Sequence, residues 1–225
     1  MTIVCSTRRF CTLVKHLSQD KKDEIERIGF GSLLSLPDIT LERKLIGQIA
    51  DRYDPNIESV IIQGTAVPIT PWDVQCIMGL RADGLIIEPK PHMDDDDYKY
   101  YFIYKEKQGM NISLHHLEEQ LIKAKNADEH FIRRFVLFTI GFLLCPTTKA
   151  FVSSHYLALV KDIEQIRHIN WAKVTRDFLI KSLNALKTGQ RSLEGNVALL
   201  QVCYELILVS IIYAIILVSI TYAIL

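Results

Sequence analysis

Residues 128–146 would be apolar on almost every side if they formed one helix. The apolar residues of this segment are Phe131, Phe135, Phe138, Ile140, Phe142 and Leu143. Asp128 can cap the start of the helix, and Pro146 ends it because proline lacks the N–H that a helix interior needs. A helix without a polar face must be covered on all sides. The segment therefore predicts a central helix with other elements packed around it.

Other segments repeat apolar residues at spacings of three and four, which marks one face of a helix. We expect helices near residues 10–17, 18–28, 40–49, 113–122 and 170–188. Their expected caps and stops are Ser18, Gly29, Thr40, Ser113, Asn170 and Gly189. The predicted fold class is mainly α, a multi-helix globular domain.

A short helix is predicted after Thr70. The Thr70 side chain can accept backbone N–H bonds, and Pro71 suits the first helical position. Asp73 can bond back to the cap and meet the positive end of the helix dipole. Gly79 can then end the helix in the left-handed conformation. All of these roles are structural.

Residues 57–69 carry the clearest β signal and predict one small hairpin. Ser59–Ile62 is a β-branched run, Gln63 and Gly64 can turn the chain, and residues 65–69 can return. Pro68 lacks an N–H, so the returning strand should be an edge strand. A lone hairpin is marginally stable, so we expect it to lean on the helices.

The charge balance gives little support for direct binding to nucleic acid. The chain has 26 basic and 26 acidic side chains, all of them within residues 1–205. A domain that binds nucleic acid through its charge would show a basic excess. The five cysteines form no CxxC pair, which argues against zinc ribbons and redox motifs. An odd cysteine count fits a reducing compartment.

The last segment, Leu206 to Leu225, is uncharged. It contains a tandem repeat, because residues 207–215 read ILVSIIYAI and residues 216–224 read ILVSITYAI. Its length meets the roughly 20 residues that a helix needs to span a membrane. We therefore divide the chain into a helical domain, residues 1–205, and a hydrophobic tail, residues 206–225.

Several interpretations of this tail stay open. It could be a transmembrane anchor, an extension of the last core helix, or an aggregation-prone β segment. It could also be a spurious extension that arose from a short duplication. We thus expect residues 1–205 to form a soluble domain, and one expectation for Leu206 to Leu225 is association with a membrane.

The sequence offers no recognisable catalytic, cofactor-binding or metal-binding motif. His115 and His116 are adjacent, so they diverge by about 100° on a helix and cannot easily share a metal. His130 has no partner at ligand spacing. Ser153 and Ser154 precede His155, but a nucleophile and its base normally meet across the fold. We predict no catalytic residue, no cofactor and no metal, and hence no enzyme.

Two further patterns also favour structural roles. Residues 94–97 are four consecutive aspartates, but they lack the glycine and the distant glutamate of a calcium-binding loop. We expect a solvated, mobile loop there. Aromatic residues follow between Tyr98 and Tyr104, interleaved with lysine. They superficially resemble a base-stacking platform, but we expect the rings to pack on the domain.

Ordered sequence blocks resemble the plant mobile domain, a family often labelled "aminotransferase-like plant mobile domain". The blocks are residues 5–10 (CSTRRF), 28–34 (IGFGSLL), 53–55 (YDP), Gly64 with 69–74 (ITPWDV), 78–80 (MGL), 144–148 (LCPTT), 170–172 (NWA) and 199–204 (LLQVCY). The resemblance covers roughly residues 4–205. Each block is weak alone, and their shared order makes the match specific.

The resemblance implies a transposon-derived, largely helical, nuclear domain without established catalysis. Some family members are tied to meristem maintenance and silencing. Relatives often carry a SUMO-protease-type peptidase domain, but the resemblance transfers no protease residue to this sequence. It transfers no transaminase residue either, despite the "aminotransferase" label.

Four hypotheses about the role of the chain follow. The first is a non-catalytic nuclear domain that acts through protein or chromatin contacts, with partners that the sequence does not identify. The second is a tail-anchored membrane protein with a cytosolic helical domain. The third is a cryptic enzyme, which would need a pocket with converging polar groups near His155 or Cys145. The fourth is a non-functional gene fragment.

Overall fold

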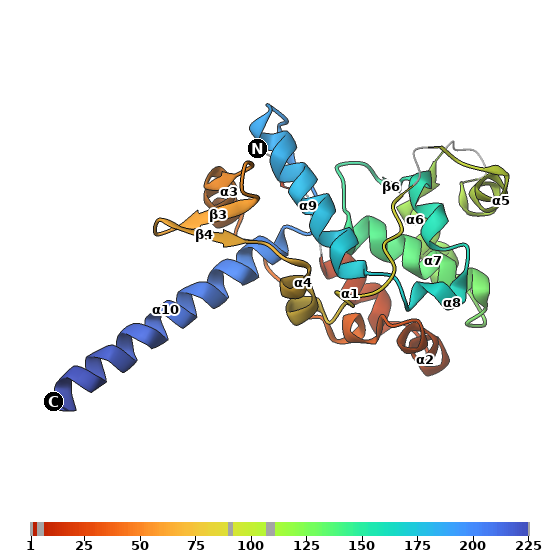
Figure 1. Cartoon of the computed structure of the whole chain (residues 1–225). Coiled ribbons are helices and arrows are strands. Elements are labelled where there is room, and N and C mark those ends of the chain that lie inside the picture. Colours follow the sequence, from red (N-terminus) through yellow and green to blue (C-terminus); the bar gives the residue numbers. More distant parts are fainter. Residues whose placement is uncertain (1, 4–6, 90–91, 107–110, 225) are drawn as a thin grey trace.

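The computed structural model describes residues 2–3, 7–89, 92–106 and 111–224. Along the last helix it describes side chains as far as Ser210, together with Ile212 and Tyr213. Cys5 and Ser6, which open the first family-like block, lie outside the described residues. The fold is mainly α, as predicted, with helices gathered around a shared core (Figure 1).

The helices are α1 (Thr7–Lys15), α2 (Gln19–Arg27), α3 (Arg43–Asp51), α4 (Pro71–Met78), α5 (Asp95–Tyr104), α6 (Leu114–Lys123), α7 (Glu129–Thr139), α8 (Ile163–Ile166), α9 (Trp171–Lys187) and α10 (Ala198–Ile224). Shorter helical turns are η1 (Gly31–Ser35), the π-helical η2 (Ile140–Leu144) and η3 (Ser154–Leu159). The strands are β1 (Thr2–Ile3), β2 (Tyr53–Asp54), β3 (Ser59–Ile62), β4 (Thr65–Pro68), β5 (Ile112–Ser113), β6 (Phe151–Val152) and β7 (Ser192–Leu193).

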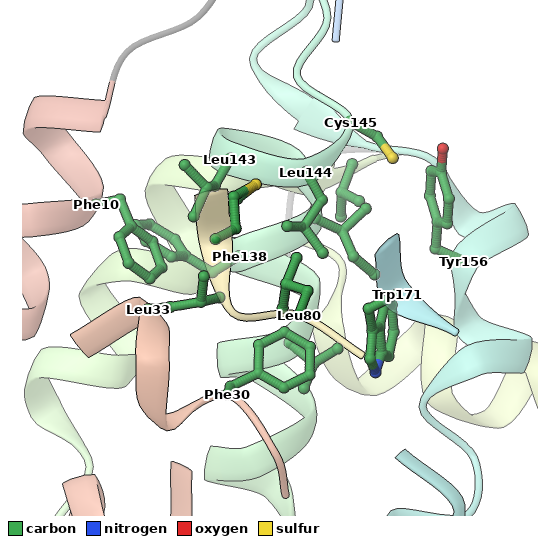
Figure 2. Close-up of a cluster of buried hydrophobic side chains, with 14 of the residues drawn as sticks. Phe10, Phe30, Leu33, Leu80, Phe138, Leu143, Leu144, Cys145, Tyr156 and Trp171 are labelled. Atoms are coloured by element: carbon green, nitrogen blue, oxygen red, sulfur yellow. The ribbon is translucent and has the colours of Figure 1, made fainter. Parts of the chain in front are cut away.

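The apolar segment predicted to be central is central. α7 and η2 are buried on nearly every side, and the rings of Phe131, Phe135 and Phe138 are inaccessible to solvent. Phe138 lies in one cluster with Phe10 of α1 and Leu143 of η2 (Figure 2). This helix is the scaffold on which the other elements pack.

Its last turn widens into a π-helix before Pro146. The Cys145 N–H donates to the Ile140 carbonyl at 2.8 Å, a bond across five residues rather than four. A Cβ at Gly141 would lie 2.3 Å from Leu114 Cδ2, so the glycine lets α6 approach closely. Such π-turns occur often at functional sites.

The structure confirms the caps predicted for four helices. Asp128, Ser113 and Asn170 each accept a backbone N–H at the starts of α7, α6 and α9. At α4, Thr70 Oγ1 accepts from the Asp73 N–H at 3.2 Å, and Asp73 Oδ2 accepts from the Thr70 N–H at 2.7 Å. These bonds satisfy N–H groups that have no partner inside a helix.

The Gly79 stop is also confirmed. Gly79 has φ 67°, in the left-handed region. Its N–H donates to the Gln75 carbonyl at 2.7 Å, which closes the end of α4. A Cβ there would lie 2.4 Å from Ser32 Cβ, so both conformation and space require glycine.

The predicted hairpin is present, with Gln63 and Gly64 at its turn. β3 pairs antiparallel with β4, and Pro68 lies on that edge strand opposite Ser59. A third short strand, β2, extends the sheet on the other side of β3. The sequence suggested a turn after Asp54 and missed this strand, because two residues are too few to show alternation.

The prediction of only one small hairpin was too narrow. Two further two-residue pairs exist, β1 with β7 in parallel and β5 with β6 antiparallel. Each joins segments far apart in the chain. Such contacts depend on the folded topology, so no local sequence pattern predicts them.

The start predicted for α3 was wrong. The helix begins at Arg43 and not after Thr40. Gln201 of α10 holds residues 40–42 outside the helix: its Oε1 accepts from the Glu42 N–H at 2.9 Å and its Nε2 donates to the Thr40 carbonyl at 3.4 Å. A tertiary contact overrides the local capping signal.

The expectation of a mobile loop at residues 94–97 was also wrong. Asp94 caps α5, and Asp97 completes a capping box. Lys161 pairs with Asp94 at 2.5 Å and with Asp97 at 3.0 Å. Carboxylates at a helix N-terminus meet the positive end of its dipole, which offsets their mutual repulsion.

The C-terminal segment starts inside the core. Ala198 and Leu199 are buried, and α10 then continues past residue 206 and extends away from the other helices (Figure 1). Leu206 and Tyr213 are exposed. No helix within the described residues is long and apolar enough to cross a membrane. A separate hydrophobic tail gains no support, and most of its predicted side chains lie outside the described residues.

Candidate binding groove

A groove of about 710 Å³ runs along one face of α9. It has three walls: the α9 face, residues 86–89, and residues 145–156 after the π-helix. Its volume falls within the roughly 300–1,000 Å³ typical of ligand pockets. It is the candidate functional site of the domain.

The α9 wall is a stripe of residues at helical spacing. Val174 and Phe178 supply its apolar centre, and Lys173, Asp177 and Lys181 flank them. Lys173 and Asp177 form an ion pair. No ion pair within the described residues involves Lys181. The wall thus combines an apolar centre with one positive charge that lacks an acidic partner.

Residues 81–85 hold the second wall against the start of α9. The Leu85 N–H donates to the His168 carbonyl at 2.7 Å, and the Asn170 N–H donates to the Leu85 carbonyl at 2.9 Å. The Asn170 side chain also donates to the Ala82 carbonyl at 2.6 Å while it caps α9. One residue therefore fixes both the helix and the loop beside it. Ile86 directly follows this anchored segment, and its side chain lines the groove with 63% of the residue exposed.

Gly84 makes this anchoring possible. Its φ is 109°, and a Cβ would lie 2.2 Å from the His168 carbonyl oxygen. No other residue fits both the backbone angle and the space. The sequence analysis did not identify Gly84, because its role depends on a neighbour more than eighty positions away.

The third wall begins at Cys145. Its thiol lies against the Tyr156 hydroxyl (Figure 2) and donates a long bond of 3.9 Å to the Val174 carbonyl. Lys149 lies with its Nζ 5.5 Å from the centre of the Phe151 ring. This lysine, like Lys181, has no acidic partner within the described residues. The groove therefore carries two lysines without an acidic partner among the described residues, and its lining also includes Glu88 and Glu194.

The Cys145 thiol is not activated as a nucleophile. Burial raises the pKa of its thiol to about 12, although the Tyr156 hydrogen bond opposes this. Burial, and then the neighbouring Cys145, raise the pKa of Tyr156 as well. The thiolate is the nucleophilic form of cysteine, and it is absent at neutral pH when the pKa is so high. Cys145 is thus a lining residue without the properties of a nucleophile.

Ser153 and His155 do not form a nucleophile–base pair. The Ser153 hydroxyl oxygen accepts from the His155 backbone N–H at 3.3 Å, which caps η3. The His155 ring is exposed at the groove. The pocket that the enzyme hypothesis requires near His155 and Cys145 is present, but these groups are not arranged for acyl transfer.

Two other histidines have structural contacts. His115 Nε2 lies 3.4 Å from Glu119 on α6, and His130 Nδ1 lies 2.9 Å from the Tyr104 hydroxyl. Among the residues that the structure describes, no three His, Cys, Asp or Glu side chains lie together as metal ligands.

The aromatic segment divides between core and surface. Tyr104 is buried, and Tyr100 lies under the Arg133 guanidinium at 4.9 Å. Tyr98, Tyr101 and Phe102 instead line a second hollow of about 370 Å³. The expectation that the rings pack on the domain is therefore only partly correct. Tyr98 and Phe102 are exposed, whereas Tyr101 is partly buried and packs against the core.

The comparisons with known proteins identify the family. The chain matches the model described as "Domain of unknown function (DUF8566)" over residues 3–201. It is similar to the Arabidopsis thaliana "Protein MAINTENANCE OF MERISTEMS", 24% identical over 82% of this chain and 41% of that protein. It is also similar to the Arabidopsis "Protein MAIN-LIKE 2", 23% identical over 79% of this chain and 28% of that protein.

A third Arabidopsis relative is the "Serine/threonine-protein phosphatase 7 long form homolog", 26% identical over 73% of this chain and 13% of that protein. The chain thus spans less than half the length of the curated relatives that it matches. No solved structure matches it significantly. The matched model and these relatives agree with the ordered blocks of the sequence, and the chain belongs to the plant mobile domain family.

Proposed function

We propose that this chain is a non-catalytic plant mobile domain that acts through protein contacts, with the α9 groove as its contact surface. The observation that carries the proposal is the groove itself. It joins an apolar centre to two lysines that have no acidic partner within the described residues, and its Cys145 thiol is not an activated nucleophile. Apolar anchors with flanking charges are typical of surfaces that recognise protein segments.

The groove favours a partner segment of defined chemistry. An apolar side chain would contact Val174 and Phe178. An adjacent acidic residue would pair with Lys149 or Lys181, which have no acidic partner within the described residues. Charge pairs at the rim of an interface mainly set specificity and association rate.

The relatives support a biological setting for this module. One of them carries meristem maintenance in its name, and we propose the same process for this chain. We place its action in the nucleus. A fluorescently tagged full chain should concentrate in nuclei of plant cells, whereas recovery in the membrane fraction would count against this setting.

The contact surface is tested by a charge reversal in the groove. The full chain, Lys181→Glu and Lys44→Glu are purified from plant cells, and their partners are compared by quantitative mass spectrometry. Lys44 is exposed on α3, outside the groove, so its variant is the control for charge. We expect Lys181→Glu alone to lose specific partners, at least tenfold in recovery. Equal partner sets for all three proteins would contradict the proposal.

A further inference from the structure

The wall of the α9 groove formed by residues 86–89 has neither helix nor turn, and its backbone groups are unpaired. Just before it, Leu85 forms a single parallel bridge with Ile169 beside the start of α9. Both the N–H and the carbonyl of Leu85 are used there. Beyond Leu85, no backbone N–H or carbonyl of Ile86–Glu88 has a hydrogen-bond partner within the described residues. The wall therefore begins like a strand and then continues without a neighbour.

The unpaired residues lie at the surface of the groove. Ile86 and Glu88 are exposed, whereas Ile87 is half-buried and packs against the core. All three line the groove. A row of exposed, unpaired N–H and C=O groups is a template on which another chain can pair as a strand.

The local sequence favours an extended backbone at this wall. Ile86 and Ile87 are β-branched, a residue type enriched in strands. Glu88 precedes Pro89, and the residue before a proline is biased towards extended conformations. Pro89 has no N–H, so it ends the pairing edge after three residues. A charge and a proline are also features with which natural edge strands limit unwanted self-association.

The α9 side of the groove accepts side chains at the spacing of a strand. Val174 and Phe178 are four positions apart on α9, which corresponds to about 6 Å along the helix. Alternate residues of a strand repeat about every 6.7 Å on one face. A helix could match this spacing too, but its backbone groups are bonded internally and could not pair with Ile86–Glu88. The unpaired wall thus favours a strand.

We propose that the partner segment of the α9 groove binds as an extended strand, which pairs with the backbone of Ile86–Glu88 and places alternate apolar side chains on Val174 and Phe178. The inference rests on the function proposed above, because it specifies the form in which a partner enters the same groove. In strand addition, main-chain hydrogen bonds give affinity and alternate side chains give specificity. The partner is therefore a protein segment that is extended when bound and apolar at every second position.

The test begins with random peptides displayed on phage and selected on the full chain. Peptides that also bind Lys181→Glu are removed, so that those retained depend on the groove. Lys44→Glu is the control for charge and should retain them. We expect the retained peptides to carry apolar residues at every second position, since a strand presents alternate residues to one face.

Backbone pairing is then tested on the peptide. A synthetic consensus peptide is methylated at one backbone nitrogen at a time, and its affinity for the full chain is measured. Methylation at one set of alternate positions should weaken binding at least tenfold, because it removes an N–H and blocks the facing carbonyl. Methylation at the other set should have little effect, because those N–H groups point to the opposite edge.

Backbone pairing is tested independently on the full chain by hydrogen exchange, followed by nuclear magnetic resonance. The amides of Ile86, Ile87 and Glu88 should exchange rapidly in the free chain, since none of them has an acceptor within the described residues. A bound strand reaches one edge only. Exchange should therefore slow at least tenfold either at Ile87 alone or at Ile86 and Glu88 together.

Three results would overturn the proposal. Groove-dependent peptides with apolar residues at spacings of three and four, insensitive to methylation, would mean that the partner binds as a helix. Unchanged exchange at Ile86–Glu88 would mean that the peptide pairs with another part of the chain. Both results would leave the groove as a contact surface. Absence of any peptide that depends on Lys181 would remove the strand site, and the partner comparison by mass spectrometry would still decide separately on the proposed function.

Discussion

Cys145 shows how burial decides the chemistry of a single residue. The thiol lines a groove beside an exposed histidine, an arrangement that in outline resembles a catalytic pair. However, burial raises its pKa to about 12, so the nucleophilic form is missing at neutral pH. The presence of Cys145 and His155 in one groove would suggest an enzyme. The protonated state of the Cys145 thiol instead favours a binding surface.

The pKa of Cys145 predicts a pH dependence of stability. Its pKa rises from 9.0 to about 12 on folding, so above pH 9 the unfolded thiol ionises while the folded one stays neutral. The free energy of unfolding should therefore fall as pH rises from 9 towards 12. Cys145→Ala should reduce that slope, measured by urea unfolding at several pH values.

The control for this experiment is Cys76→Ala, since Cys76 is exposed. It should leave the slope unchanged. The slope will not vanish in Cys145→Ala, because burial, and then Asp73, also raise the pKa of Cys203 to about 12. Identical slopes in the wild type and Cys145→Ala would show that the thiol is not desolvated.

At the scale of elements, the strap formed by residues 81–85 positions the groove. Gly84→Ala should destabilise the fold by about 1–3 kcal/mol, because it combines a strained backbone angle with a contact of 2.2 Å to the His168 oxygen. Gly64→Ala is the matched control: its φ is also positive, at 82°, but no atom lies within 4 Å of the added Cβ. It carries the backbone strain alone.

Urea unfolding measures both glycine variants. A greater loss of stability in Gly84→Ala than in Gly64→Ala isolates the clash. Gly84→Ala should also raise hydrogen exchange at the Leu85 amide, which bonds to His168. Equal losses in the two variants would mean that the strap is not tightly packed.

The sequence predicted local structure well. Thr70, Asp128 and Asn170 were identified as caps because the bonds they make reach only three residues along the chain. The central helix was equally predictable, since a helix that is apolar on all sides must lie in the core. These signals are local, so neighbouring residues suffice.

What the sequence missed depends on distant partners. Gln201 moves the start of α3, and Lys161 orders the aspartates at the start of α5. The groove itself joins residues 86–89, 145–156 and part of α9. No local pattern connects these three walls, so the groove could not be found before the fold was known.

At the scale of the whole molecule, the chain is a family domain that carries the α9 groove on its surface. The groove has a charged rim and an apolar centre. The curated relatives are more than twice as long as the part that matches this chain. A domain that contributes one contact surface to a larger function is consistent with both observations.

The most direct measurement of the central claim is photo-crosslinking from inside the groove. The full chain is produced in plant cells with Phe178→p-benzoylphenylalanine on the α9 wall, and with the same amino acid at Lys44 as the control. We expect position 178 to crosslink to a defined partner protein and position 44 not to, and we expect Lys181→Glu to abolish the crosslink. Crosslinks of equal yield from both positions, or none from position 178, would contradict the central claim.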